Sequence, residues 1–308
     1  MKILANKLLM KVDDSAFNGA AGQPAVLLVM GLGMQLTAWP ADFVRALVAA
    51  GYRVIRFDNR DAGLSQSLDE LGKPSLLWDS MKYKLGLRIK PPYSVQDMAL
   101  DALGVLDALA LQQAHVVGVS LGGMIAQRMA LTQPWRVTSL TSIMSTSSAP
   151  GLPPPQPAVV RALLGSGNGK TPDAVVSNYI KLMQAISSPG FPLTQAQWCQ
   201  RIQPEVRRSY RPAGTLRQML AAIADVDRAP LLAGIRTPTL VLHGKSDPLL
   251  PFACGQDTAR RIPGAKLVGI EGMGHDLPPG VVRQLLKHLL PHLGAHSAVQ
   301  DCAQAAAV

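Results

Sequence analysis

The pattern of hydrophobic and polar positions alternates between two kinds of segment along most of the chain. Short, continuous apolar runs end at glycine or polar turn residues, as strands buried on both faces do. Longer segments between them carry apolar residues at helical spacing. Strands are expected at 24–31, 52–58, 114–120, 136–145, 237–244 and 265–272, and helices at 41–51, 94–111, 121–133, 251–263 and 279–293. This alternation predicts an α/β protein with a mostly parallel central sheet flanked by helices.

The alternation is interrupted once, in the middle of the chain. Residues 146–165 are rich in proline, which a central strand does not tolerate. From there to about residue 230 the segments have helical patterns separated by glycine and proline. The simplest interpretation is a core made of residues 1–145 and 233–308, ending in a flexible tail, with a helical cap inserted at 146–232.

Composition limits the possible partners. A chain of 308 residues that is 48% hydrophobic can bury one large core with an insertion. Its net charge of +10 could indicate an anionic partner. However, the basic residues are scattered, and 5% aromatic residues provide no stacking platform for nucleic acid. We therefore expect no nucleic-acid partner, while the oligomeric state stays open.

The cysteines and the N-terminal segment indicate the compartment. Cys199, Cys254 and Cys302 are too far apart for a disulfide framework or a zinc site. The first 14 residues place a lysine within their apolar stretch and lack a small-residue cleavage site, unlike a signal peptide. No segment approaches the roughly 20 apolar residues needed to cross a bilayer. The sequence predicts a cytoplasmic protein without stable membrane association.

Histidines near the C-terminus form a possible metal stripe. His288, His292 and His296 recur every four residues, but Pro291 and Gly294 interrupt the helix there. No carboxylate or cysteine joins them as a further ligand. We expect a solvated helix end, and neither a metal nor an organic cofactor.

A serine lies between an expected strand and an expected helix, within Gly118-Val119-Ser120-Leu121-Gly122. This G-x-S-x-G pattern in this setting is typical of a nucleophile held in a sharp turn. Glycines flank the serine because bulk on either side would clash, and the following helix N-terminus favours a developing negative charge. Ser120 is therefore the candidate nucleophile.

A nucleophilic serine needs a base, and the base needs a third group to orient it. Asp247 follows the expected strand at 237–244, and His275 follows the next strand. Parallel strands bring these loops to the same edge of the sheet as Ser120. We expect Asp247, rather than the adjacent Asp276, to orient His275, because neighbouring residues in an extended loop point apart.

Two backbone N–H groups are expected to form an oxyanion hole. One belongs to Leu121, directly after the serine, and the other to Leu32, in the glycine-containing loop after the first buried strand. Near the same loops, Met34, Met124 and Met273 suggest an adaptable apolar pocket for a substrate acyl or ring group.

Several segments together resemble the α/β-hydrolase superfamily from about residue 24 to 293. They are VMGLGMQLTAWPADF, IRFDNRDAGLSQ, HVVGVSLGGMIAQRMAL, PTLVLHGKSDPLLP and IEGMGHDLP. They are most similar to the aclacinomycin methylesterase-like group of bacterial carboxylesterases. The resemblance implies Ser120 as nucleophile, Asp247 as acid and His275 as base, with oxyanion donors at Leu32 and Leu121. The insertion at 146–232 matches no motif, so substrate identity is not implied.

The expected function is hydrolysis of small-molecule carboxylic esters through an acyl-enzyme. Two alternatives remain, because a fold does not fix a function. The same triad could perform C–C hydrolysis, acyl transfer or a cofactor-free lyase reaction. The chain could also bind a small molecule without turnover. A panel of esters and labelling by an organophosphonate separate these hypotheses.

Overall fold

The computed structural model describes residues 1–16, 22–74, 90–165 and 171–297, so residues 298–308 of the predicted tail lie outside it. The order of its eight-stranded sheet is β1 (Lys2–Ala5), β2 (Leu8–Asp14), β4 (Arg53–Phe57), β3 (Ala25–Val29), β5 (Ala114–Val119), β6 (Val137–Ile143), β7 (Thr239–Gly244), β8 (Lys266–Ile270). Strand β2 runs antiparallel to both of its neighbours, and β3 to β8 are parallel. The predicted mostly parallel α/β sheet is confirmed.

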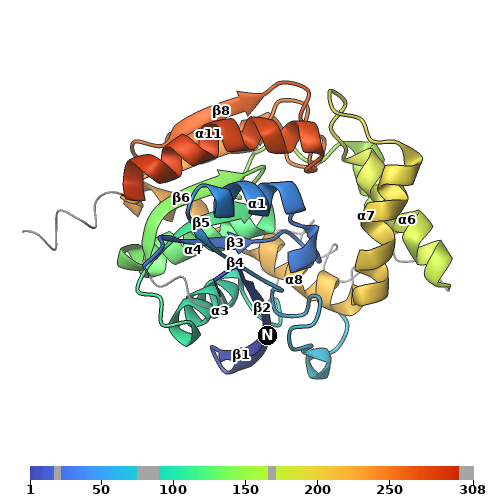
Figure 1. Cartoon of the computed structure of the whole chain (residues 1–308). Coiled ribbons are helices and arrows are strands. Elements are labelled where there is room, and N and C mark those ends of the chain that lie inside the picture. Colours follow the sequence, from blue (N-terminus) through green and yellow to red (C-terminus); the bar gives the residue numbers. More distant parts are fainter. Residues whose placement is uncertain (17–21, 75–89, 166–170, 298–308) are drawn as a thin grey trace, which may run out of the picture.

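Helices cover both faces of this sheet (Figure 1). Helices α1 (Ala41–Ala49) and α11 (Pro279–Ser297) lie on one face, and α3 (Val95–Ala108) and α4 (Leu121–Thr132) on the other. The side chains of β3 alternate between these two faces, which explains why its run is apolar throughout. Val26 and Leu28 pack in the cluster with α1 and α11, and Leu27 and Val29 in the cluster with α3 and α4. The remaining core elements are α10 (Phe252–Arg261), η1 (Leu36–Ala38), η2 (Asp69–Leu71) and η3 (Pro134–Arg136).

Helix α3 illustrates how local sequence sets an element boundary. Ser94 Oγ accepts the N–H of Asp97 at 3.1 Å, and the Asp97 carboxylate accepts the N–H of Ser94 at 2.8 Å. This reciprocal capping box satisfies two backbone donors at the helix start. The helix therefore begins directly after Ser94, within the segment 94–111 that is expected to be helical.

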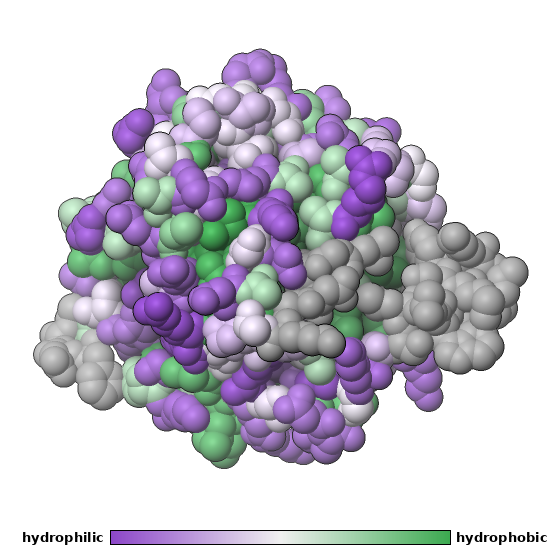
Figure 2. Space-filling view, turned by 90° about the vertical axis from the view of Figure 1, so that its right-hand side faces the viewer, coloured by the Kyte–Doolittle hydropathy of each residue, from purple (hydrophilic) through white to green (hydrophobic). Residues whose placement is uncertain are grey.

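Between β6 and β7 all regular elements of the described residues are helical. They are α5 (Pro157–Gly165), α6 (Pro172–Ala185), α7 (Gln195–Arg208), α8 (Pro212–Ala224), α9 (Arg228–Leu231) and η4 (Leu232–Gly234). Ile180, Trp198 and Ile202 form a small hydrophobic cluster joining α6 to α7. The face that carries α6 and α7 is dominated by hydrophilic residues, with hydrophobic ones visible near its centre (Figure 2). We call residues 146–232 the cap, and its bounds stay a prediction.

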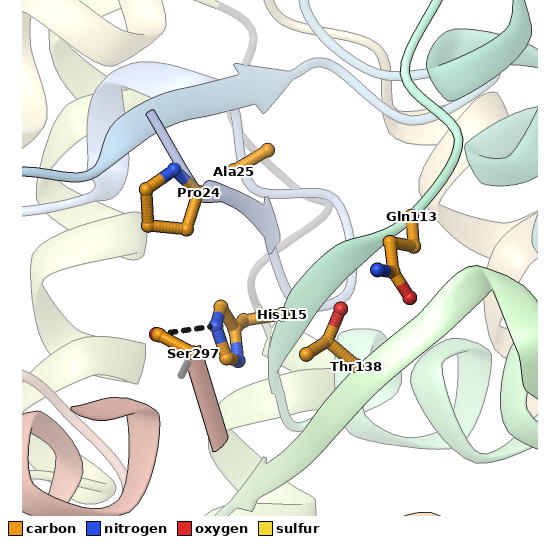
Figure 3. Close-up of a pocket in the computed structure, with 6 residues that line it drawn as sticks. All are labelled: Pro24, Ala25, Gln113, His115, Thr138 and Ser297. Atoms are coloured by element: carbon orange, nitrogen blue, oxygen red, sulfur yellow. Dashed lines mark hydrogen bonds between the residues drawn. The ribbon is translucent and has the colours of Figure 1, made fainter. Parts of the chain in front are cut away.

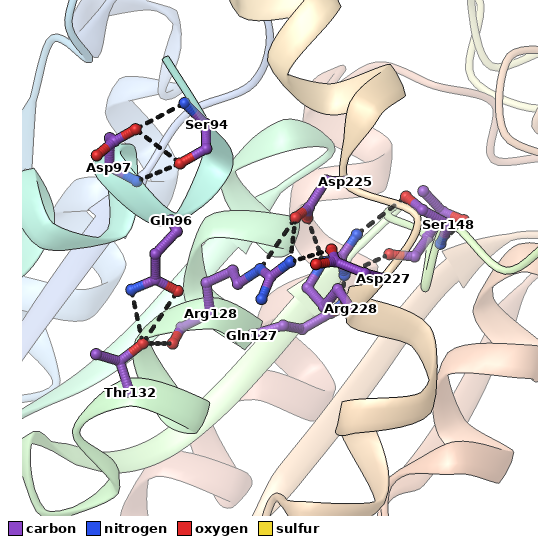
Figure 4. A network of polar contacts seen from close by, with 11 residues as sticks. Ser94, Gln96, Asp97, Gln127, Arg128, Thr132, Ser148, Asp225, Asp227 and Arg228 are labelled. Carbon is purple, nitrogen blue, oxygen red and sulfur yellow. Dashed lines mark hydrogen bonds and ion pairs between the residues drawn. The ribbon is translucent and has the colours of Figure 1, made fainter. Parts of the chain in front are cut away.

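Both ends of the cap are tied to helix α4 by a buried arginine (Figure 4). Arg228, whose side chain is fully buried, donates to Thr146 O at 3.1 Å and Ser148 Oγ at 3.0 Å near the start of the cap. It also pairs with Asp225 at 2.7 Å near the end of the cap and donates to Gln127 on α4. Neither end of the cap can therefore move without breaking a buried polar network.

Candidate active site

Ser120 lies in a strained turn between β5 and α4. Its φ of +55° and ψ of −119° fall in a region that residues with a side chain rarely adopt. A Cβ on Gly118 would lie 2.1 Å from the carbonyl oxygen of Gly122, and a Cβ on Gly122 would lie 2.0 Å from that of Val29. Only glycine fits at both positions, so the G-x-S-x-G pattern follows from close backbone packing around the serine.

The structure brings Ser120, His275 and Asp247 into one hydrogen-bonded chain. His275 Nε2 lies 3.0 Å from Ser120 Oγ, and His275 Nδ1 lies 2.7 Å from Asp247 Oδ2. The serine is partly exposed, whereas the other two are buried. With Nδ1–H donating to the carboxylate, Nε2 is free to accept the serine proton. This arrangement can generate an alkoxide nucleophile, and the roles of the three residues stay a prediction.

The loop after β7 holds the Asp247 carboxylate in place. Asp247 Oδ1 accepts the N–H groups of Leu249 at 2.9 Å and Leu250 at 2.8 Å, which leaves Oδ2 for His275. The same loop is closed by His243, whose Nε2 lies 2.7 Å from Leu250 O. Burial lowers the pKa of His243, which favours the neutral ring. Sequence reasoning missed His243, although it lies only four residues before Asp247.

Asp276 does not hydrogen-bond to the ring of the adjacent His275. Instead, its Oδ1 accepts the N–H of Ser188, in the cap, at 3.0 Å and the hydroxyl of the same residue. Burial raises the pKa of the Asp276 carboxyl to about 6, although the Ser188 hydrogen bonds and the charge of Arg201 act in the opposite direction. The backbone N–H of His275 donates to Ile186 O, in the cap, at 2.7 Å, so the cap also holds the histidine loop. No motif in the sequence signals this contact.

The β3 loop, defined as residues 30–36, passes beside the serine. A Cβ on Gly31 would lie 3.2 Å from Ser120 Cβ. Within the described residues, neither the Leu32 N–H nor the Leu121 N–H donates a hydrogen bond to another protein group. Both therefore remain available to a ligand, as oxyanion donors must be. Their assignment as the oxyanion hole stays a prediction.

The three methionines expected in a substrate pocket have different surroundings. Met34, in the β3 loop, is half-buried, and its sulfur accepts the hydroxyl of Tyr179 from cap helix α6 at 3.4 Å. Met124 and Met273 are buried in the hydrophobic clusters on opposite faces of the sheet. Met34 thus contacts the cap directly through Tyr179. A pocket built from all three stays a prediction.

A separate small pocket lies at the opposite, amino edge of the sheet (Figure 3). Its lining residues are Pro24, Ala25, Gln113, His115, Thr138 and Ser297. His115 Nε2 lies 3.1 Å from Ser297 Oγ, and burial lowers the pKa of this histidine to about 4. The serine, aspartate and histidine described above all follow the carboxyl ends of strands instead, where ligands bind in open α/β sheets.

None of the described helices is both long and apolar enough to pass through a bilayer.

Residues 24–278 match the family described as alpha/beta hydrolase fold. The rhodomycin D methylesterase DauP of Streptomyces sp. strain C5 is 30% identical, over 95% of this chain and 99% of that protein. DnrP of Streptomyces peucetius, also a rhodomycin D methylesterase, is 28% identical over the same shares.

A solved structure supports the fold. The meta-cleavage product hydrolase of Pseudomonas fluorescens IP01 superposes with a TM-score of 0.71 at 19% identity, covering 96% of this chain and 97% of its own. At that identity the likeness concerns the fold alone. The predicted resemblance is confirmed by the family match and the methylesterase relatives. The chain therefore belongs to the α/β-hydrolase fold family.

Proposed function

We propose that the protein hydrolyses small-molecule carboxylic esters through an acyl-enzyme on Ser120. The protein is a carboxylesterase-type hydrolase by its family and by its two methylesterase relatives. The observation that carries the serine mechanism is the hydrogen-bonded chain from Ser120 Oγ through His275 to Asp247. That chain supplies a nucleophile, a base and a group that orients the base.

In the first half of the reaction, His275 Nε2 takes the Ser120 proton as the serine oxygen attacks the ester carbonyl carbon. The carbonyl oxygen gains negative charge, and the N–H groups of Leu32 and Leu121 stabilise it. When the tetrahedral intermediate collapses, His275 returns the proton to the leaving alcohol. Asp247 fixes the imidazole tautomer and stabilises the transient imidazolium.

In the second half, a water molecule replaces the alcohol. His275 takes a proton from that water, whose oxygen attacks the acyl carbon and forms a second tetrahedral intermediate. Collapse of this intermediate breaks the bond to Ser120 Oγ, and His275 protonates the serine. The carboxylic acid leaves, and the enzyme returns to its starting state.

We further propose that the substrate carries an apolar acyl or ring group that lies near Met34, with the cap limiting its size. DauP and DnrP are named as methylesterases of rhodomycin D, which supports a small-molecule ester as the substrate. The methionine side chains are adaptable and suit an irregular apolar surface. A cytoplasmic location also stays a prediction.

The proposal is tested by incubating the protein with methyl and p-nitrophenyl esters of increasing acid size and measuring both products. We expect equal amounts of acid and alcohol, and a fall in kcat of roughly 10⁴- to 10⁶-fold in Ser120→Ala. Turnover by Ser120→Ala above a few per cent of wild type would remove this serine from the mechanism. Cleavage of ketones without cleavage of esters would support C–C hydrolysis instead. Binding of a small molecule without turnover would support a binding protein.

A further inference from the structure

We propose that Gln218, on cap helix α8, is a positioning residue that orients the β3 loop for oxyanion stabilisation. This inference rests on the proposed function. If the Leu32 N–H is an oxyanion donor as proposed, the cap holds the loop that carries this backbone group, in addition to covering the substrate. Gln218 itself contacts neither the substrate nor the reacting atoms, and acts through the backbone of the β3 loop.

The Gln218 side chain is completely buried and uses both of its polar atoms. Its Oε1 accepts the N–H of Gly33 at 2.8 Å, and its Nε2 donates to the carbonyl of Arg60 at 2.6 Å. Gly33 belongs to the β3 loop, and Arg60 to the loop after β4. One amide thus bridges two core loops from a cap helix.

The hydrogen bond from Gly33 to Gln218 holds the turn formed by residues 31–34, which also contains the Leu32 N–H. Met34 N–H donates to Gly31 O at 3.2 Å, and Gly33 has a φ of +65°, which a type II turn requires at its third residue. Because each peptide unit is planar, holding Gly33 N–H fixes the Leu32–Gly33 peptide at the centre of this turn. The Leu32 N–H belongs to the adjoining Gly31–Leu32 peptide, which the Met34 N–H to Gly31 O hydrogen bond closes into the same turn. The N–H of Leu32 is left without a partner in the described part of the protein.

Glycine at position 33 creates the need for such a tether. A Cβ there would lie 2.6 Å from Thr215 Oγ1, on the same helix as Gln218, so a side chain does not fit. Glycine, however, has the widest choice of backbone conformations. An external acceptor is therefore needed to select one of them, and oxyanion stabilisation depends on donors that are already oriented.

A second cap contact restrains the same loop further along. Gln35 Nε2 donates to Glu205 O at 2.6 Å and to Ser209 O at 3.1 Å, both at the end of α7. The N–H of Leu36 is held from the core side by Asp58 Oδ1 at 2.7 Å. The β3 loop is thus anchored on either side of Met34, and only the Gln218 contact acts directly on the turn that contains Leu32.

The test compares Gln218→Leu, which has no acceptor for Gly33 N–H, with wild type on a small soluble ester. The affinity for a trifluoromethyl ketone, to whose carbonyl carbon the Ser120 oxygen adds to form an oxyanion, is compared with the affinity for the matching methyl ketone. We expect kcat to fall about 10- to 100-fold and the trifluoromethyl ketone to bind weaker by a similar factor. KM and methyl ketone binding should change less than about threefold, since the ground state makes little use of the oxyanion hole.

A second variant keeps the inference testable if Gln218→Leu does not fold. In Gln218→Glu, the protonated acid can accept from Gly33 and donate to Arg60. The ionised acid cannot donate, and the Arg60 carbonyl oxygen repels it, which displaces the acceptor from Gly33 N–H. Its kcat relative to wild type should therefore decrease as pH rises. Gln203→Leu, at an exposed glutamine of α7, is the matched control and should behave as wild type.

Each outcome separates the inference from the proposed function. If wild type turns over esters while both Gln218 variants keep its kcat and its trifluoromethyl ketone affinity, the inference alone is wrong. Equal weakening of the two ketones would indicate a general loss of structure and would also overturn it. If wild type neither turns over esters nor binds the trifluoromethyl ketone covalently at Ser120, the proposed function and the inference both fail.

Discussion

At the scale of single residues, the two aspartates near His275, Asp247 and Asp276, have different hydrogen-bond partners. Asp247 contacts the imidazole at 2.7 Å, while Asp276 points its hydrogen-bonded oxygen at Ser188 in the cap. Adjacent side chains in an extended loop point apart, which is the reason for expecting Asp247 rather than Asp276 to orient His275. The sequence alone could not predict that Asp276 is buried, because burial here depends on a cap segment about 90 residues away.

The first prediction compares the two aspartates by substitution with asparagine. Asp247→Asn should lower kcat by roughly 10⁴-fold, because the amide no longer favours the tautomer that accepts the serine proton. Asp276→Asn keeps an oxygen that can accept from Ser188 and should stay within about tenfold of wild type. Steady-state kinetics on one good ester decides, and the opposite order of losses would contradict the assignment of Asp247.

The second prediction concerns pH and stability. Asp276 has a pKa of about 6 in the folded protein, above its ordinary value of 3.8, chiefly because it is buried. The folded state therefore binds more protons than the unfolded chain between these values, and stability falls as pH rises from about 4 to 6. Two pKa units correspond to roughly 3 kcal/mol. Asp276→Asn removes this contribution.

Urea unfolding of wild type and Asp276→Asn across pH 4 to 7 measures the effect. Relative to wild type, the variant should gain free energy of unfolding, by up to roughly 3 kcal/mol, as pH increases. Glu70→Gln, at an exposed carboxylate, is the control and should show a small difference throughout. A difference between Asp276→Asn and wild type that is constant over this range would contradict the prediction.

At the scale of elements, the strands and core helices follow from the sequence, whereas the cap's attachment does not. Apolar runs and glycine or proline breaks identify β3 to β8 because each strand is buried by its own neighbours. Polar contacts that fasten the cap join residues far apart in the sequence, such as Ser188 and Asp276, 88 residues apart, or Gln218 and Arg60, 158 residues apart. Polar residues at helical surfaces carry no periodic signal for a particular partner.

The third prediction tests the buried arginine that joins both ends of the cap. Arg228→Met removes the ion pair with Asp225 and leaves the carbonyl of Thr146 without its donor. Breaking such a buried network should lower the free energy of unfolding by about 3–5 kcal/mol. Urea denaturation measures the loss, and Arg207→Met, at an exposed arginine of α7, should change it by less than about 0.5 kcal/mol. Similar stability of the two variants would contradict a clamping role.

At the scale of the whole molecule, the sheet and the cap meet around the predicted catalytic residues. The cap segment around Ser188 holds the histidine loop, and α8 holds the β3 loop. These two cap contacts hold loops that follow β8 and β3, which lie on opposite sides of β5, the strand that leads to Ser120. The three residues of the candidate site could be selected from strand-end motifs, because the predicted catalytic side chains follow the strands of the sheet. The cap residues that position their loops could not, since nothing in the sequence marks their spatial partners.

Whether Ser120 is the nucleophile is measured directly by the intact mass of the protein after reaction with a fluorophosphonate, followed by peptide mapping. The reagent loses fluoride as the activated serine oxygen bonds to phosphorus. We expect one adduct per chain, located on Ser120, with parallel loss of ester turnover and no adduct in Ser120→Ala. Full ester turnover in a protein that stays unlabelled, or an adduct on another residue, would contradict Ser120 as the nucleophile.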